Sequence, residues 1–259
     1  MSSPPNTSET NATGSPDEVI TAGLIIIGDE ILSGRTKDRN IGYIAEYLTA
    51  IGIDLAEVRI VPDVEARIVE AVNALRHAYT YVFTTGGIGP THDDITADSI
   101  AKAFGVGIDH HPEAVAILKQ RYTDDQLNAA RLRMARVPDG GHLVHNPVSG
   151  APGFCIGNVY VMAGIPSIMQ GMLDGIAPML KTGRKMLSET VEARIPESLL
   201  AEGLGKIEAA REGVMIGSYP FMDAHGYGTR LIVRSRDAAA AAAAAEEVRQ
   251  LAASLKPDM

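Results

Sequence analysis

The sequence predicts an α/β fold with a largely parallel sheet, and three observations carry this prediction. Apolar runs of strand length alternate along the chain with segments whose apolar residues recur at helical spacing. The first run, residues 20–27, is almost wholly apolar and ends at Gly28, as is typical of a buried parallel strand. The connections between successive runs are long enough to hold helices, which parallel neighbours need as crossovers.

The elements of the first part of the chain follow from these patterns in order. Apolar and β-branched runs bounded by turn residues predict strands at residues 20–27, 53–61, 81–85 and 159–163. Apolar residues three and four apart predict helices near residues 41–51, 62–75, 95–104 and 167–180, with further helical segments between 112 and 136. Gly52 follows the first of these helices as a stop signal.

A second, smaller domain is expected after Thr182. The pattern predicts a strand at residues 191–195, a helix at 196–210, two hairpin strands at 214–219 and 229–236, and a final helix from residue 238. Asp237 precedes an alanine run and is expected to cap that last helix. The order is therefore strand, helix, two strands and helix, which predicts a small α+β domain over residues 189–259, after a larger domain over residues 19–182.

Composition narrows the classes of protein. Residues 1–18 are mostly Ser, Thr, Pro, Asn, Glu and Asp and contain no Ile, Val, Leu or Phe, so we expect a disordered tail there. The formal net charge of −9 argues against nucleic acid as a partner. Cys155 is the single cysteine, which excludes an internal disulfide framework and fits a reducing, cytoplasmic environment. Neither a membrane-spanning run nor a secretory signal is present, so no membrane partner is expected.

The most informative segment is the glycine loop, residues 84–96, which lies between a predicted strand and a predicted helix. Its three glycines, Gly86, Gly87 and Gly89, allow the backbone to approach an anion closely and to point N–H groups at phosphate oxygens. It is neither a Walker loop nor a dinucleotide Gly-X-Gly-X-X-Gly motif. The competing interpretation is a simple turn in which Asp94 or Thr96 caps the following helix.

Acidic residues accompany this loop where a lysine would be expected. Asp93 and Asp94 would repel a phosphate unless a hard divalent cation lay between them. A second cluster, residues 28–34, ends the first strand and contains Gly28, Asp29, Glu30 and Ser33. Loops at the carboxyl ends of parallel strands meet at one edge of the sheet, so this cluster is expected to face the same ligand. Asn40, just before a helix, is by default a capping residue.

These residues resemble the signature of the molybdopterin-binding (MoaB/Mog-like) superfamily. The resemblance rests on Gly86-Gly87-Ile88-Gly89-Pro90-Thr91-His92-Asp93-Asp94-Ile95-Thr96, on residues 21–34, and on the motifs at 146–147, 151–154 and 164–166. Its Pro-Thr-His-Asp-Asp form is similar to the branch that holds the N-terminal part of competence/damage-inducible protein A and the molybdopterin-binding-like domain of eukaryotic FAD synthases. The resemblance covers residues 20–180, and the region after residue 189 is similar to the small domain that follows in this branch.

The resemblance implies a three-layer α/β/α domain that binds a pterin or a dinucleotide pyrophosphate at the glycine loop. In the damage-inducible branch it implies metal-dependent hydrolysis of ADP-ribose or FAD, and in the molybdenum-cofactor branch it implies binding or adenylylation of molybdopterin. Asp94 matches the acidic residue that the superfamily places after the glycine loop. Ile168 stands where the branch has an acid. Because the chain ends at Met259, deamidation by a further C-terminal domain is not expected.

Two hypotheses follow, with one site. The first is a metal-dependent nucleotide pyrophosphatase that uses magnesium or cobalt. The alternative is a molybdopterin-binding or adenylylating protein without hydrolase activity. The resemblance also implies a homo-oligomer, either a dimer or a trimer. RNA binding by the small domain lacks support, because that domain has neither a Gly-X-X-Gly between two helices nor a basic stripe. Asp94 and Asp93 are the candidate catalytic residues, and both, with Glu30, are the candidate metal ligands. The candidate substrate-binding residues are Gly28, Asp29, Glu30, Ser33, Asn40, Gly86, Gly87, Gly89, Thr91, Thr96 and Gly164.

Overall fold

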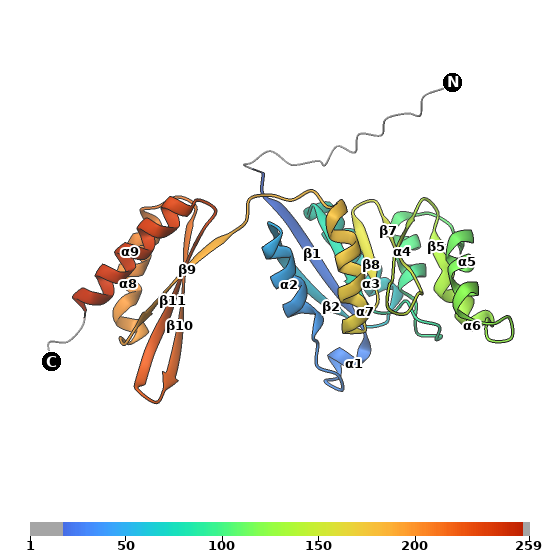
Figure 1. Ribbon diagram of the computed structural model, residues 1–259, viewed down its shortest axis with the longest axis horizontal. Helices are drawn as coiled ribbons and strands as arrows, with labels where there is room; N and C mark the ends of the chain where they lie inside the picture. The colour runs from blue at the N-terminus through green and yellow to red at the C-terminus, as the bar shows by residue number, and fades with distance from the viewer. Residues whose placement is uncertain (1–17, 256–259) are drawn as a thin grey trace, which may run out of the picture. The chain divides into compact units, whose positions relative to one another are not determined.

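The computed structural model describes residues 18–255, which form two compact units (Figure 1). The first unit extends to Gly183 and the second begins at Arg184. The predicted disordered tail falls, apart from Glu18, outside the described residues. The Glu18 carboxylate lies 2.5 Å from the ammonium group of Lys181, so this residue belongs to the folded unit and the tail prediction was wrong for it. No helix within residues 18–255 is long and apolar enough to cross a membrane.

The sheet of the first unit contains the strands β1 (Ile20–Ile27), β2 (Ile53–Val61), β3 (Tyr81–Thr85), β6 (His142–Val144), β7 (Gly153–Ile156) and β8 (Val159–Met162). Their order is β2-β1-β3-β8-β7-β6. The first four strands of that order are mutually parallel, and β7 and β6 extend the sheet in antiparallel pairing. The predicted largely parallel sheet is therefore confirmed. β6 and β7 were not predicted from the sequence: β6 has only three residues, and β7 lies in a glycine- and proline-rich stretch without a clear apolar run.

Helices cover both faces of this sheet. They are α1 (Asp29–Leu32), α2 (Asn40–Ala50), α3 (Glu65–Ala78), α4 (Thr96–Phe104), α5 (Pro112–Arg121), α6 (Ala129–Leu132) and α7 (Pro166–Ile176), with single 3₁₀ turns at Arg133–Ala135 and Ala177–Met179. The last helix was predicted to continue to residue 180, but Pro178 lies just beyond it and a 3₁₀ turn replaces its final turn. A separate two-stranded antiparallel sheet joins β4 (Ile108–His110) to β5 (Arg136–Pro138).

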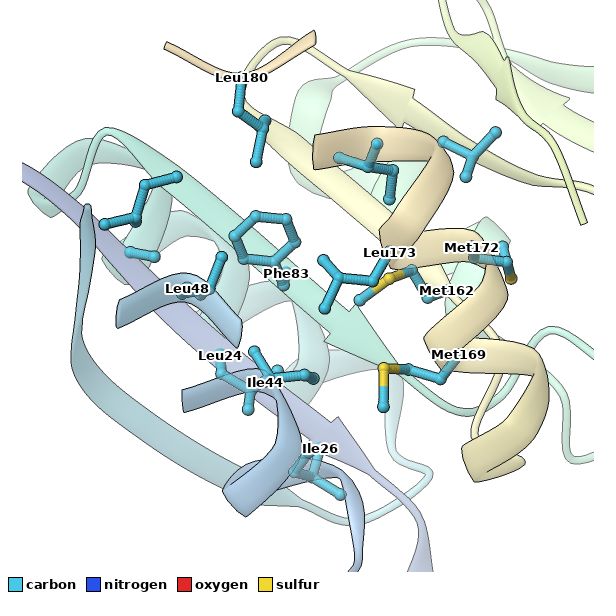
Figure 2. Packing of buried hydrophobic residues seen from close by; sticks show 14 of the residues in the cluster. Leu24, Ile26, Ile44, Leu48, Phe83, Met162, Met169, Met172, Leu173 and Leu180 are labelled. Atoms are coloured by element: carbon cyan, nitrogen blue, oxygen red, sulfur yellow. The ribbon is translucent and has the colours of Figure 1, made fainter. Parts of the chain in front are cut away.

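Alternate residues of β1 divide the core into two layers. Leu24 and Ile26 pack in the cluster beneath α2 and α7, which Figure 2 shows, whereas Ile25 and Ile27 pack in the cluster beneath α3 and α4. Successive side chains of a strand point to opposite faces, so an entirely apolar strand must be covered on both. The predicted three-layer arrangement is confirmed. Because the central strands are parallel, their carboxyl ends lie at the same edge of the sheet, and the loops of the candidate site follow them there.

The second unit is a three-stranded antiparallel sheet with two helices. Its elements are β9 (Leu187–Ala193), α8 (Glu197–Ala209), β10 (Val214–Asp223), β11 (Gly226–Ser235) and α9 (Ala238–Ser254), and the strand order is β10-β11-β9. The predicted α+β class is right, but the first strand was placed too late. Its opening residues, 187–190, are all exposed and, apart from Leu187, polar, so they showed no apolar alternation that would predict a strand. Asp237 caps α9 as predicted, since its carboxylate accepts hydrogen bonds from the backbone of Ala239 and Ala240.

Candidate active site at the carboxyl ends of the parallel strands

The glycine loop takes a backbone path that only glycine fits. Gly86 and Gly87 have φ values of +102° and +68°, a region that other residues rarely adopt. A Cβ atom at Gly86 would lie 2.2 Å from the carbonyl oxygen of Ile27, at the end of the neighbouring strand β1. The two strand ends therefore approach more closely than any larger residue would permit. No acceptor within residues 18–255 contacts the N–H groups of Gly87, Ile88 and Gly89.

Thr96 holds this loop against the first turn of α4. Its side chain is fully buried, and its hydroxyl donates to the carbonyl oxygen of Gly86 at 2.9 Å, while its N–H donates to the carbonyl oxygen of Gly87 at 3.0 Å. The residue before α4 is Ile95, which provides no side-chain cap. Thr96 is therefore a support for the glycine loop, and the interpretation of this residue as a helix cap was wrong.

Asp94 closes the other end of the loop. One of its carboxylate oxygens, Oδ2, accepts hydrogen bonds from the N–H of Thr91 at 2.8 Å and from the Thr91 hydroxyl at 2.5 Å. A Cβ atom at Gly89 would lie 2.6 Å from that oxygen, so the carboxylate is pressed against the loop backbone. Arg133 donates to the carbonyl oxygen of Asp94 at 3.1 Å. Asp94 thus orders a turn within the loop and does not cap α4, contrary to the simpler interpretation.

A carboxylate that was not among the predicted site residues lies beside the acidic cluster after β1. Asp63, just beyond the end of β2, accepts a hydrogen bond from the N–H of Asp29 at 3.0 Å. Burial raises the pKa of Asp63, and repulsion from Asp29, Glu30 and Asp93 raises it further, against the lowering effect of that hydrogen bond. These four carboxyl groups therefore share one electrostatic environment. The rule that strand ends meet at one edge would have identified Asp63 as well.

Asp93 is the exposed member of this group. Hydrogen bonding from Thr91 lowers its pKa most, its own backbone N–H lowers it further, and the nearby His92 adds a small electrostatic effect. The pKa of Asp93 is thus lowered beside the loop, whereas that of Asp63 is raised. Ser33 lies outside this environment: its exposed hydroxyl donates to the carbonyl oxygen of Glu30 at 3.3 Å.

Asn40 joins two loops and does not cap a helix. Its amide donates to the carbonyl oxygen of Gly164 at 2.9 Å, and its side chain is buried. The cap of α2 is supplied by Asp38, whose carboxylate accepts the N–H groups of Asn40 and Ile41 at 3.1 and 2.8 Å. The default prediction for Asn40 was therefore wrong. Gly164 in turn packs on Gly86, because a Cβ atom there would lie 3.2 Å from the Gly86 Cα.

These loops enclose a cavity of about 720 Å³. Among the predicted site residues, those that line it are Gly28, Glu30, Gly86, Gly87, Gly89, Asp93, Asp94 and Gly164. Thr91 and Thr96 support the loop from behind, and Asp29 and Ser33 do not line the cavity. Unpredicted residues complete the wall: Asp63, Tyr122, Arg131 and Asn146, together with Ile168 at the position where the family branch has an acid. The guanidinium of Arg131 lies 4.4 Å from the centre of the Tyr122 ring.

A ready-made metal site is absent from the described part of the chain, where no three Asp, Glu, His or Cys residues are grouped closely enough to hold an ion. The donors that line the cavity are nevertheless hard oxygen atoms, from Glu30, Asp63, Asp93 and Asp94. Magnesium in nucleotide enzymes is commonly held by one or two carboxylates together with oxygens of the bound phosphates. The carboxylates of this cavity fit that mode of binding, because they offer hard oxygen atoms beside the backbone N–H groups that would hold the phosphates.

These features define a three-layer α/β domain with a candidate ligand site at the carboxyl ends of its parallel strands. The chain belongs to the molybdopterin-binding domain family: residues 23–182 match the family model described as "Probable molybdopterin binding domain". Residues 185–257 match the model described as "FAD synthase, middle domain". The resemblance inferred from the glycine loop is thereby confirmed, and it extends over both units.

Similar proteins agree with this assignment. A CinA-like protein of Gemmatimonas aurantiaca is 34% identical, over 83% of this chain and 54% of that protein. A protein of Aeropyrum pernix is 32% identical, over 77% of this chain and 78% of its own length. Among solved structures, the CinA protein of Thermoplasma acidophilum is 32% identical with a TM-score of 0.58, and the match covers 61% of this chain and 96% of that one.

Proposed function

We propose that this protein cleaves the pyrophosphate of an adenine dinucleotide, such as ADP-ribose or FAD, with the aid of a divalent metal ion. The observation that carries the proposal is the juxtaposition, in one cavity, of unpaired backbone N–H groups at Gly87, Ile88 and Gly89 with the carboxylates of Glu30, Asp63, Asp93 and Asp94. Donors of this kind bind phosphate oxygens, whereas carboxylates beside them would repel phosphate without a cation.

The loop residues would position the substrate. The N–H groups of Gly87 and Ile88 belong to the peptide units whose carbonyls accept hydrogen bonds from Thr96, so they can hold the charge that develops on a phosphoryl oxygen without reorganising. Asp94, with one oxygen occupied by Thr91, keeps its carboxylate beside the loop. Asp63 lies at the same cavity, and its N–H partner Asp29 holds its carboxylate at the end of β2.

The metal would be magnesium or cobalt, held by one or two of the carboxylates of Asp94, Asp93 and Glu30 together with oxygens of the bound phosphates. When bound, such an ion neutralises phosphate charge and acidifies an attacking water. The match of residues 185–257 to the FAD synthase middle domain supports a nucleotide as the ligand. The second candidate is molybdopterin binding or adenylylation without hydrolysis, of which the family description supports the binding of molybdopterin. We also propose a homodimer or homotrimer; a mass of 27.4 kDa by light scattering at micromolar concentration would contradict it.

The decisive experiment incubates the purified chain with ADP-ribose or FAD, with and without Mg²⁺ or Co²⁺, and measures AMP. Asp94→Asn should lower turnover at least about a hundredfold, because an amide binds a hard cation weakly and the ion is needed to activate water. The variant should fold normally, since asparagine retains an acceptor for Thr91. Asp124→Asn, at an exposed position outside the cavity, is the matched control. Absence of AMP from the wild-type protein with every metal would contradict hydrolysis and leave ligand binding as the function.

A further inference from the structure

A second cavity, of about 490 Å³, adjoins the glycine-loop cavity and has the opposite balance of charge. Ile27, Glu30, Thr36, Gly164 and Pro166 line both. The glycine-loop cavity is lined by four acidic residues and a single basic one, Arg131. The second cavity is lined by three basic residues, Arg35, Lys37 and Arg39, and two acidic ones, Glu30 and Asp38. One continuous ligand could therefore meet carboxylates at one end and cations at the other.

The three cations come from the segment between α1 and α2, which is held in place by its own backbone. The N–H of Gly34 donates to the carbonyl oxygen of Ile31, and the N–H of Thr36 donates to that of Glu30, at 3.1 and 3.0 Å. At the other end of the segment, Asp38 accepts the N–H groups that begin α2. The side chains are thus presented by an ordered loop, so a ligand would not have to order it.

These cations have no partner within residues 18–255. Neither an ion pair nor a hydrogen bond engages the side chains of Arg35, Lys37 or Arg39 there. In the nearest acid in sequence, Asp38, one carboxylate oxygen accepts two backbone N–H groups, and the side chain forms no ion pair with these cations. Positive charge that remains uncompensated beside a cavity attracts an anionic ligand, and in a chain of net charge −9 it is not the product of a generally basic surface.

The floor of this cavity also has unused hydrogen-bonding groups. Asn40 and Thr85 line it, and the carboxamide oxygen of the first and the hydroxyl of the second are buried without a partner. The amide nitrogen of Asn40 is occupied by Gly164. An unpaired buried polar group carries a free-energy cost that a ligand hydroxyl can remove. A sugar hydroxyl can both donate to an amide oxygen and accept from a threonine.

We propose that the second cavity binds a phosphomonoester carried on a ribose, so that the substrate is an adenine dinucleotide with a phosphate beyond its pyrophosphate, such as ADP-ribose 2′-phosphate. The inference rests on the proposed function, because it takes the pyrophosphate to lie on the glycine loop. Arg35, Lys37 and Arg39 hold the additional phosphate without a metal. They select among nucleotides and take no part in bond cleavage.

The test compares binding of ADP-ribose and ADP-ribose 2′-phosphate by calorimetry with Ca²⁺ in place of Mg²⁺ or Co²⁺, so that a cation screens the carboxylates, in samples that release no AMP. The wild-type protein should bind the phosphorylated compound about tenfold more tightly or better, as charge-assisted hydrogen bonds predict. Lys37→Gln combined with Arg39→Gln should abolish this preference while leaving the affinity for ADP-ribose nearly unchanged. Arg67→Gln combined with Lys119→Gln, exposed positions outside both cavities, is the charge-matched control and should keep the preference. Raising the salt concentration should reduce the preference of the wild-type protein.

Equal binding of the two compounds by the wild-type protein, or no binding of either, would overturn the inference. A preference that survives in the double variant would also overturn it, and so would a preference that is lost in the control. Tighter binding of neopterin monophosphate than of either dinucleotide would assign the phosphomonoester to a pterin and overturn the ribose assignment. Failure of the proposed hydrolysis is seen separately, as absence of AMP with added Mg²⁺ or Co²⁺, and does not alter the preference measured with Ca²⁺.

Discussion

The amide of Asn40 donates a hydrogen bond to the carbonyl oxygen of Gly164 at 2.9 Å, although 124 positions of sequence separate the two residues. The bond joins the start of α2 to the loop that follows β8. Gly164 also packs against Gly86 of the glycine loop. Three loops at the same edge of the sheet are therefore linked through one asparagine, which lines the second cavity and bonds to Gly164, a residue that lines both.

Replacing Asn40 should affect stability and binding together. Asn40→Ala removes the bond to Gly164 and should lower the free energy of unfolding by about 1–2 kcal/mol. It should also weaken binding of ADP-ribose, because the loop after β8 loses its anchor. Asn158→Ala is the control: its amide donates to the carbonyl oxygens of Arg76 and Tyr79, both at 3.0 Å, at the opposite edge of the sheet. Urea unfolding and calorimetry would measure both effects, and equal affinity in the two variants would contradict the linking role.

Gly87→Ala should disrupt the glycine loop more than its backbone conformation alone requires. The new Cβ atom would lie 2.2 Å from the Thr96 hydroxyl oxygen, which must move and release the carbonyl of Gly86. Gly105→Ala is a matched control, because Gly105 has the same φ of +68° and open space around it. The control should lose about 1–2 kcal/mol, the usual cost of this conformation, and the Gly87 variant should lose more.

A double substitution separates the two contributions at Gly87. Adding Thr96→Ala to Gly87→Ala removes the clashing hydroxyl, so part of the excess loss should be recovered in a double-mutant cycle. Thermal or urea unfolding of the single and double variants gives the coupling. Strict additivity of the two substitutions would show that the predicted clash is not the cause.

The contribution of Asp63 to the free energy of unfolding should decrease as the pH rises. Its pKa is higher in the folded state than the ordinary value of 3.8, because of burial and of neighbouring carboxylates, so the folded state binds this proton more tightly. Its contribution to the free energy of unfolding therefore declines as the pH rises from 3.8 through the raised value. Asp63→Asn keeps an acceptor for the N–H of Asp29 and should remove the decline, which makes the variant more stable than the wild type at neutral pH.

The measurement for Asp63 is urea unfolding across the acidic to neutral range. Asp124→Asn, at an exposed position, should retain the wild-type pH dependence. A pH dependence that is identical in the Asp63 variant and the wild type would show that Asp63 does not carry this effect. Addition of Mg²⁺ should also raise the stability of the wild type more than that of the Asp63 variant, because the cation relieves the crowding of carboxylates.

Asp237 should show the opposite dependence in the second unit. Hydrogen bonds from the backbone N–H groups of Ala240 and Ala239 lower its pKa, so its stabilising effect is present above the unfolded pKa and is lost as the pH falls through the folded value. Asp237→Ala should lower the melting temperature of this unit by several degrees, and Asp237→Asn should preserve most of it, since asparagine caps as well. Calorimetry would follow the transition; equal losses in both variants would contradict a capping role.

Local pattern was sufficient for most of the fold. β1, β2 and β3 were predicted at their observed bounds, because long apolar runs ended by glycine or proline specify a strand without reference to the rest of the chain. The short strands β6 and β7 and the polar start of β9 were missed. Their pairing depends on neighbours that the fold supplies, and their own residues carry no period that distinguishes them from loops.

The sequence by itself determined the glycine loop and its acidic companions, because positive φ values demand glycine and a strand followed by a helix places the loop at a known edge. Only the tertiary structure decided what surrounds it. It places Asp63 near Asp29, Glu30 and Asp93, and it makes Asn40 a link between two loops. It also places Arg35, Lys37 and Arg39 along a second cavity. Periodicity reports how one segment folds, whereas contacts between distant segments follow from the order of strands in the sheet, which no local pattern encodes.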